Sequence, residues 1–154
     1  MLIEVKVKVA RIIDAKTRKR TETYLLDKEF FSEAEYIVTA YLNTQVAEGT
    51  VESFEIQSLK LSQIKEVASQ FDGENSFIAT LIDIWLDDDG TEKKLKYKVL
   101  LWADTPSQAM SNILQLAREG YDMQIEGIKQ VDYEYLVGTS ETPNTEEENE
   151  QNEG

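Results

Sequence analysis

Hydrophobic and polar residues alternate near the start of the chain. Every second residue from Ile3 to Val9 is aliphatic, and the residues between them are charged. Alternate side chains of a strand point to opposite faces, so this period of two predicts a strand with one buried face. Residues 77–86 predict a second strand, which is more continuously apolar.

A return strand is predicted after each of these strands, over residues 21–26 and residues 95–102. A loop over residues 14–19 joins the first pair. In the second pair Asp89-Gly90 predicts a tight turn, because glycine reaches the positive φ that a two-residue hairpin turn requires. The run of aspartates before Gly90 also suggests calcium ligands, but an EF-hand spaces its ligands along a longer loop. The turn is therefore the favoured interpretation.

A helix is predicted after each hairpin, from its capping signals and its apolar period. Ser32 and Glu35 have the spacing of a capping box, and Thr105 and Gln108 repeat that spacing in the second copy. Glycines at positions 49 and 120 predict the C-terminal ends of the two helices.

The last strand of each copy is predicted over residues 51–61 and residues 125–137. The apolar phase shifts between Ile56 and Leu59, which indicates a bulge in the first of them. Residues 62–71 are interpreted as a short helix that joins the two copies.

The order of elements thus occurs twice, with an offset of 75 residues that places Tyr24 on Val99. Beyond the helix the offset slips by one, so Phe54 falls on Ile128. We interpret the pattern as a tandem duplication of a β-β-α-β unit in the α+β class, a mainly antiparallel sheet with helices packed on one face. Residues 1–71 form the first unit and residues 76–138 the second, packed together as one compact domain. Residues 139–154, rich in glutamate, are predicted to be a disordered acidic tail.

Composition excludes several kinds of chemistry. The 154 residues include no cysteine and no histidine, which removes the thiolate nucleophile, the commonest general base and the commonest metal ligands. No catalytic constellation, metal site or cofactor is expected, and an enzyme is not predicted. The N-terminus lacks the pattern of a signal peptide, and no run approaches the about 20 apolar residues of a membrane span. We expect a cytoplasmic protein that does not bind membranes.

The formal net charge is −14, but twelve of the sixteen basic residues lie in the two predicted hairpins, residues 1–31 and 76–104. Because a helix covers one side of a three-stranded sheet, the other side is expected to carry lysines and aromatic rings. Trp85 and Trp102 lie in apolar runs and are expected in the core. The candidate nucleic-acid-binding residues are Lys6, Lys8, Arg18, Lys19, Arg20, Tyr24, Lys94, Lys96, Tyr97 and Lys98.

Two interpretations of these cations stay open. One is a surface that tracks phosphates, with Tyr24 and Tyr97 stacking on bases, as in proteins that bind single strands. The other is a solvated sheet face, where alternating lysines protect against aggregation. The acidic tail is equally ambiguous, because it can occupy a basic groove or dock on a partner, or it can serve solubility alone.

The run from Tyr24 to Glu35, YLLDKEFFSEAE, is the most specific in the chain. With the strand before it and Phe54-Glu55-Ile56 after it, it resembles a domain-of-unknown-function family of gut Bacteroidetes and their phages. The resemblance covers about residues 3–137 and is strongest in the first half. This chain departs from the family at its first strand, where the family tends to have an aromatic residue and a cysteine. The resemblance implies a phage or mobile-element origin, and it supplies no activity and no site residues.

The leading functional hypothesis is a non-catalytic, phage-type single-stranded DNA-binding or replication-accessory protein whose tail recruits replication or host proteins. The rival hypothesis is a protein-interaction module that acts on a host protein through its acidic surface. A minor structural protein ranks third.

Overall fold

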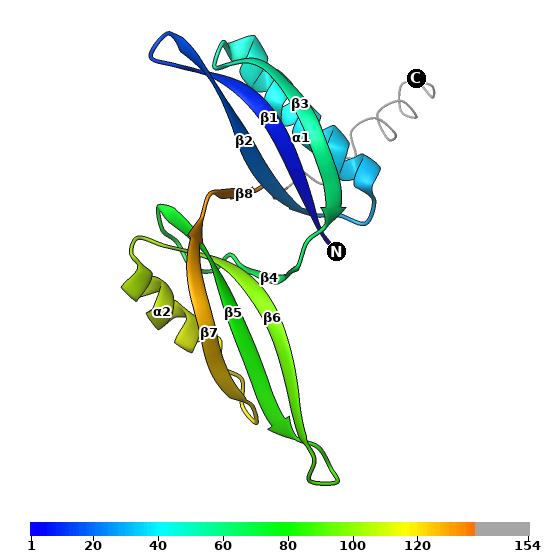
Figure 1. The fold of residues 1–154 in the computed structure, drawn as a ribbon, viewed down its shortest axis with the longest axis vertical. Helices are drawn as coiled ribbons and strands as arrows, with labels where there is room; N and C mark the ends of the chain where they lie inside the picture. Colours follow the sequence, from blue (N-terminus) through cyan, green and yellow to red (C-terminus); the bar gives the residue numbers. More distant parts are fainter. Residues whose placement is uncertain (138–154) are drawn as a thin grey trace, which may run out of the picture. The chain divides into compact units, whose positions relative to one another are not determined.

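The computed structural model describes residues 1–137, which form eight strands and two helices. This part of the chain is mainly β and divides into two compact units (Figure 1). The first unit comprises Met1–Leu61 and the described residues from Glu134 onward, and the second comprises Ser62–Tyr133. The predicted tail, residues 139–154, lies outside the described residues.

The first unit is a four-stranded sheet with one helix. Its elements are β1 (Leu2–Ile13), β2 (Lys16–Asp27), α1 (Phe31–Glu48), β3 (Val51–Leu61) and β8 (Tyr133–Tyr135), and the strand order is β3-β1-β2-β8. The predicted alternation in the first strand is confirmed, because Ile3, Val5, Val7 and Val9 are completely buried. The core residues on the helix-covered face are Ile3, Val5, Val7, Val9, Tyr24, Leu26, Ala34, Val38, Leu42 and Val51.

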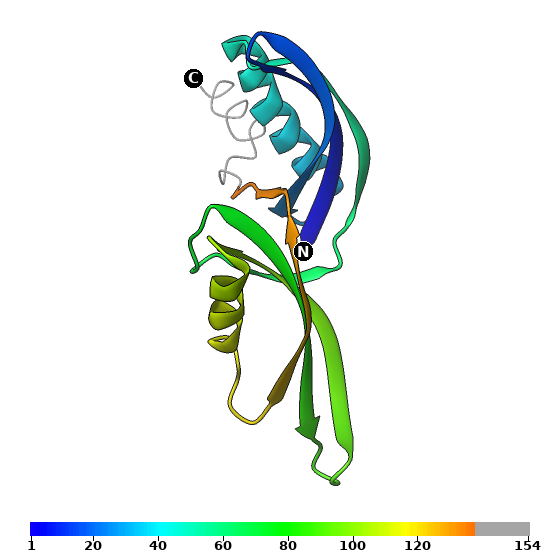
Figure 2. The same ribbon diagram turned by 60° about the vertical axis from the view of Figure 1, so that its left-hand side comes forward.

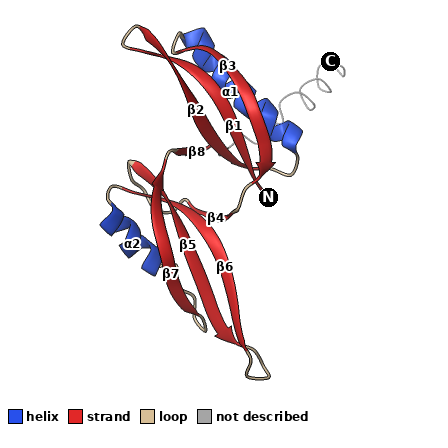
Figure 3. Ribbon diagram, viewed as in Figure 1, coloured by secondary structure: helices blue, strands red, loops and turns tan. Residues whose placement is uncertain are grey.

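The second unit has the same arrangement. Its elements are β4 (Ile64–Ala68), β5 (Asn75–Leu86), β6 (Glu92–Ala103), α2 (Pro106–Leu114) and β7 (Asp122–Val131), in the strand order β4-β6-β5-β7. Figures 2 and 3 show each helix lying along one face of its own sheet. The buried residues of this separate core are Ala68, Phe77, Ala79, Leu81, Val99, Leu101, Ala103, Ala109 and Ile113.

A β-bulge occurs at the same point in both sheets. The register between β1 and β3 shifts at Gln57, and the register between β5 and β7 shifts at Glu126. The bulge predicted between Ile56 and Leu59 is therefore confirmed. Glu126 lies 69 residues after Gln57, so the predicted alignment of Phe54 with Ile128 is wrong. The reason is that α2 has 9 residues where α1 has 18.

The fourth strand of each sheet is supplied by the chain that leaves the other unit. β3 runs on into β4, which pairs with β6 in parallel, and β7 runs on into β8, which joins the edge of β2. The predicted helix over residues 62–71 is wrong, because Ile64 and Ala68 are buried in a strand. The structure gives the two units other bounds than the predicted 1–71 and 76–138, and each unit has its own core.

The two hairpin turns differ from each other. β1 and β2 pair as far as Ile13 and Lys16, and Asp14 and Ala15 form a two-residue turn with φ of 52° and 63°. The predicted loop over residues 14–19 is therefore wrong, because aspartate tolerates the left-handed region without glycine. In the second hairpin Gly90 has the predicted positive φ, 83°, but the predicted two-residue turn is wrong, because β5 and β6 pair only as far as Leu86 and Glu92.

In each helix one end was predicted correctly and the other was not. Thr105 Oγ1 accepts a hydrogen bond from the Gln108 backbone N–H at 3.1 Å, so the second N-cap is confirmed. In α1 the N-cap is Phe30 and no side chain caps the helix, so the predicted Ser32 capping box is wrong. Gly49 ends α1 in the left-handed conformation as predicted, whereas α2 ends at Leu114, well before Gly120. Within residues 1–137, neither helix has the length and apolar character that a bilayer crossing needs.

Because β8 completes the first sheet, a substitution in the last described residues is expected to act on the first unit. Leu136 packs against the core of the first unit, and its N–H donates to the Leu25 carbonyl at 3.0 Å. We expect Leu136→Ala to destabilise the first unit by about 1–2 kcal/mol, because a partly buried leucine is truncated. Native-state hydrogen exchange should show lost protection in β1 and β2, with β5 and β6 unchanged.

The matched control is Val137→Ala, since that neighbouring side chain is 78% exposed. Loss of protection in the second unit instead of the first would contradict the assignment of Leu136 to the sheet of β2.

Candidate nucleic-acid interface

The face of the first sheet that α1 leaves uncovered carries three of the predicted lysines. Lys6 and Lys8 alternate with the buried residues of β1, and in β2 they stand opposite Thr23 and Thr21. Lys19 stands opposite Ala10 and therefore points to the same side. The prediction that Lys6 and Lys8 share one face is confirmed, and we call this surface, Lys6, Lys8 and Lys19, the lysine face.

Carboxylates neutralise this surface only in part. Glu4 and Glu55 lie on the same side of the sheet, and Glu4 is paired with Lys60 at 3.4 Å. Within residues 1–137, no salt bridge involves the three residues of the lysine face. The surface therefore keeps an excess of positive charge.

Arg18 and Arg20 do not lie with these lysines. They belong to β2 itself and stand opposite Arg11 and Val9, on the helix-covered side of the sheet. Their predicted place in a hairpin loop is wrong because the short turn lets the strand continue through them. The period of two then sends Lys19 to one face and its two neighbours to the other.

A buried carboxylate organises the cations on the helix-covered side. Glu22, whose side chain is 11% exposed, accepts hydrogen bonds from Arg11, from Arg20 Nε at 2.7 Å and from the Tyr24 hydroxyl. Arg11 also donates to Gln45 Oε1 at 2.6 Å. Burial acts to raise the pKa of Glu22, but the hydrogen bonds from Arg11, Tyr24 and Arg20 outweigh it and lower this pKa to about 2. Glu22 is thus held as an anion.

Neither predicted stacking tyrosine presents its ring on the lysine face. Tyr24 is 1% exposed and meets Tyr41 edge to face, with 5.8 Å between ring centroids. Burial raises the pKa of its hydroxyl. Its predicted role in base stacking is corrected, because a ring enclosed in the core under α1 has no free face. Tyr24 is a core residue with a polar tip.

Tyr97 lies on the helix-covered side of the second sheet. Its hydroxyl donates to Asp83 at 3.2 Å, and the Lys65 ammonium lies 5.3 Å from the ring centroid. Burial, followed by the hydrogen bond to Asp83, raises the pKa of Tyr97 to about 12. Its predicted place beside Lys96 and Lys98 on one surface is therefore wrong.

The lysines of β6 share the uncovered face of the second sheet, as predicted. Lys94, Lys96 and Lys98 stand opposite Ile84, Ile82 and Thr80 of the central strand β5. Lys96 is paired with Glu126 at 2.9 Å, and Lys98 donates to Gln63 at 3.3 Å. One of these three lysines is thus neutralised by a carboxylate, and within the described residues Lys94 and Lys98 form no salt bridge.

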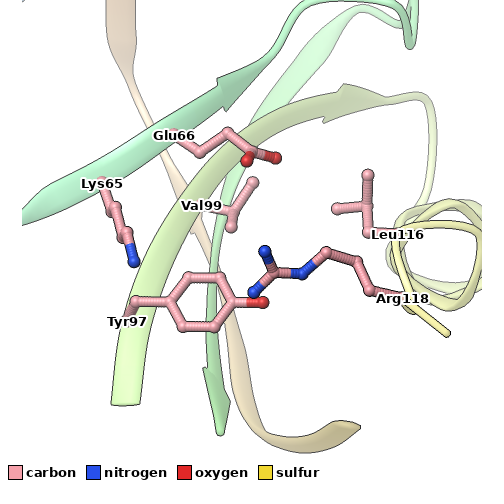
Figure 4. A pocket seen from close by; sticks show the side chains of 6 residues that line it. All are labelled: Lys65, Glu66, Tyr97, Val99, Leu116 and Arg118. Atoms are coloured by element: carbon pink, nitrogen blue, oxygen red, sulfur yellow. The ribbon is translucent and has the colours of Figure 1, made fainter. Parts of the chain in front are cut away.

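A small pocket of about 70 Å³ opens on the helix-covered side of the second unit. Figure 4 shows the Tyr97 hydroxyl and the Arg118 guanidinium pointing toward one another at its side. Arg118 Nη2 donates to Asp83 at 2.7 Å, and Asp83 is 2% exposed. Sequence reasoning missed this group, although an aspartate inside the run Leu81-Ile82-Asp83-Ile84 was a visible signal. The lining residues are Lys65, Glu66, Tyr97, Val99, Leu116 and Arg118.

The chemistry of the described residues is that of binding by charge. In residues 1–137, no group of three or more acidic side chains is placed to hold a metal ion. Glu22 and Asp83, two carboxylates on the helix-covered sides of the sheets, are each engaged by an arginine and a tyrosine. The arrangement on the lysine face can hold an extended polyanion through ammonium groups and hydroxyls.

The Glu22 network predicts a dependence of stability on pH. The pKa of Glu22 is lower in the folded protein than its ordinary value near 4.5, so its stabilising effect is complete above that value and is lost as pH falls toward 2. We expect the free energy of unfolding to fall by on the order of 3 kcal/mol more in the natural protein than in Glu22→Gln over this range. Urea denaturation between pH 6 and about pH 2 measures both.

Glu52→Gln, at an exposed position of β3, removes one carboxylate outside the network and is the control. An equal loss of stability in the natural protein and in Glu22→Gln would show that the network contributes nothing.

Comparison with known proteins identifies a family without assigning an activity. No curated protein matches the chain, and no solved structure matches it. One family model matches residues 1–137, the same residues that the structure describes, and its description is Domain of unknown function (DUF4494). The resemblance to a domain-of-unknown-function family is thereby confirmed, and the chain belongs to the DUF4494 family.

Proposed function

We propose that this chain is a non-catalytic protein that binds single-stranded nucleic acid through its phosphates. The observation that carries the proposal is the lysine face, where Lys6, Lys8 and Lys19 share one uncovered sheet surface and form no salt bridge within the described residues. Lys94 and Lys98 on the second sheet are a weaker, secondary contact.

Opposite charges separate across the first unit. Helix α1, on the far side of the sheet from the lysine face, contains Glu33, Glu35 and Glu48 and no lysine or arginine. At physiological salt the Debye length is about 8 Å, so a phosphate at the surface responds mainly to the charges nearest to it. The local excess of ammonium groups therefore outweighs the overall charge of −14 for a strand on the lysine face.

The mode of binding follows from the groups on this surface. Thr21, Thr23 and Ser58 lie beside the lysines and offer hydroxyl donors to phosphate oxygens. Since Tyr24 and Tyr97 lie on the helix-covered sides, base stacking has no part in the proposal. Binding is therefore expected to be independent of base sequence and strongly dependent on salt.

The proposed setting is that of a replication-accessory protein in the cytoplasm, encoded by a phage or mobile element. The common topology and the matching bulges at Gln57 and Glu126 support a tandem duplication as its origin. The segment of residues 139–154 contains six glutamates and no basic residue. In this proposal it competes with nucleic acid for the lysine face and recruits basic partner proteins.

Removing the lysine face tests the proposal. The change is Lys6→Gln, Lys8→Gln and Lys19→Gln together, and the measurement is fluorescence titration of labelled oligo-dT at several salt concentrations. Each phosphate contact contributes about 0.7 to the log–log salt slope on single strands, so the triple variant should lose about 2 from the slope. Its affinity should fall by about 100-fold at about 0.1 M salt, because each contact contributes about 5-fold there.

The control variant carries Lys28→Gln, Lys65→Gln and Lys93→Gln, which remove the same charge outside both uncovered sheet faces and should change the affinity much less. The proposal fails if neither the whole chain nor a variant that ends at Val137 binds oligo-dT at low salt.

A second candidate function is a protein-interaction module, and one observation favours it. Ile78, Ile82 and Ile84 of the central strand β5 point to the uncovered face of the second sheet and are partly exposed. A row of aliphatic side chains on a surface suits a protein partner better than a phosphate backbone.

For this candidate, Ile82→Gln should abolish capture of a partner from a host lysate, while Ser53→Gln on the first sheet leaves it intact. Nuclease treatment distinguishes the two functions. One stoichiometric partner retained after nuclease supports the interaction module, whereas loss of all captured proteins after nuclease contradicts it.

A further inference from the structure

Strand β2 is an exposed sheet edge along its first half. Its second neighbour, β8, has three residues against the twelve of β2. The residue after β8, Leu136, is hydrogen-bonded to Leu25 near the far end of β2. A strand this short beside Leu25 does not extend to Thr21. Among residues 1–137, the backbone from Lys16 to Thr21 therefore has β1 on one side and no strand on the other.

This open edge carries cations on both of its sides. Four of the five residues from Lys16 to Arg20 are basic. Lys19 points to the lysine face, whereas Arg18 and Arg20 point to the helix-covered side. A polyanion that follows the edge therefore meets an ammonium group from one side and two guanidinium groups from the other.

The two arginines are incompletely neutralised, and Arg20 is held in place by Glu22. Arg18 stands directly opposite Arg11 in the antiparallel register, an unfavourable pairing of like charges. The Arg11 guanidinium is bound by Glu22 and Gln45, and no salt bridge involves Arg18 within the described residues. Arg20 uses Nε for Glu22 and remains 50% exposed.

An oxyanion between these groups would relieve their mutual repulsion. The guanidinium group is planar and offers paired N–H donors that match two oxygens of a phosphate, which an ammonium group does not. Because Glu22 fixes Arg11 and the Nε of Arg20, less side-chain entropy is lost when the terminal nitrogens of Arg20 bind. The Arg18 and Arg20 pair thus has the chemistry of a phosphate site.

We propose that a phosphodiester strand runs along the open edge of β2, contacted by Lys19 on one side and by Arg18 and Arg20 on the other. This inference rests on the proposed function, because it takes the same ligand as the lysine face. It adds a second row of contacts on the opposite side of the sheet. The path of the nucleic acid then includes the edge of β2 as well as the lysine face. The shared chemistry is a phosphate oxyanion, supplied by a strand or by free phosphate.

The experiment uses the full chain and labelled oligo-dT, with three paired variants. Arg18→Gln with Arg20→Gln tests the edge, Lys6→Gln with Lys8→Gln tests the lysine face, and Lys65→Gln with Lys93→Gln, on the helix-covered side of the second sheet, is the control of equal charge change. At about 0.7 per contact, the edge variant should lose about 1.4 from the salt slope and about 25-fold in affinity at about 0.1 M salt. Circular dichroism establishes that each variant is folded.

The outcomes separate the two proposals. An edge variant no weaker than the control, together with a weakened Lys6 and Lys8 variant, overturns the edge path and leaves the proposed function standing. No binding by the natural protein overturns both. A second arm follows the Arg18 and Arg20 side-chain N–H signals by NMR with inorganic phosphate alone. If inorganic phosphate causes chemical-shift changes as large as those that oligo-dT causes at equal phosphate concentration, the site binds an isolated phosphate. That result would overturn the proposal of a bound strand.

Discussion

One helix covers one face of each sheet in this protein, and this constraint determines the rest of its surface. A strand sends alternate side chains to opposite sides, so each sheet turns half of its residues toward its helix and the other half away from it. In the first sheet the uncovered half contains Lys6, Lys8 and Lys19. In the second it contains isoleucines of β5 beside the lysines of β6. Nucleic-acid binding is proposed from the lysines of the first face, and protein interaction is proposed from the isoleucines of the second.

The same constraint explains the carboxylates on the helix-covered sides. The strands of each sheet are longer than the helix that packs on it, and polar groups on the covered side then lie at the margin of the core. Glu22 and Asp83 occupy such positions, and each is bound by an arginine and by a tyrosine hydroxyl. A buried carboxylate without such donors would be strongly destabilising. The arginines that satisfy Glu22 also bring positive charge to the edge of β2.

Sequence reasoning succeeded where a local period determined the outcome. The residues of β3, 51–61, and its bulge follow from the apolar phase alone, as does the common face of Lys6 and Lys8. It failed where the outcome depended on a distant partner. Ile64 and Ala68 form a strand because the edge of β6 is there to receive them, and nothing local to residues 62–71 specifies that edge.

The errors at the site have one source, which is the length of a turn. Counting a six-residue loop places Arg18 and Arg20 outside the sheet, whereas the two-residue turn at Asp14 and Ala15 extends β2 through them. The register of β2 against β1 then determines the side of the sheet to which each arginine points. Tyr24 was misplaced for a related reason, because an aromatic residue beside cations in a strand does not reveal which face the helix covers.

The central claim is that phosphates bind to the uncovered side and open edge of the first sheet. The most direct measurement is the change in backbone amide chemical shifts when unlabelled oligo-dT is added to the isotope-labelled full chain. The account predicts changes concentrated in β1 and β2 at residues 6–8 and 16–21, with α1 unaffected. Changes confined to α1 or to the second unit, or no changes at low salt, would contradict it.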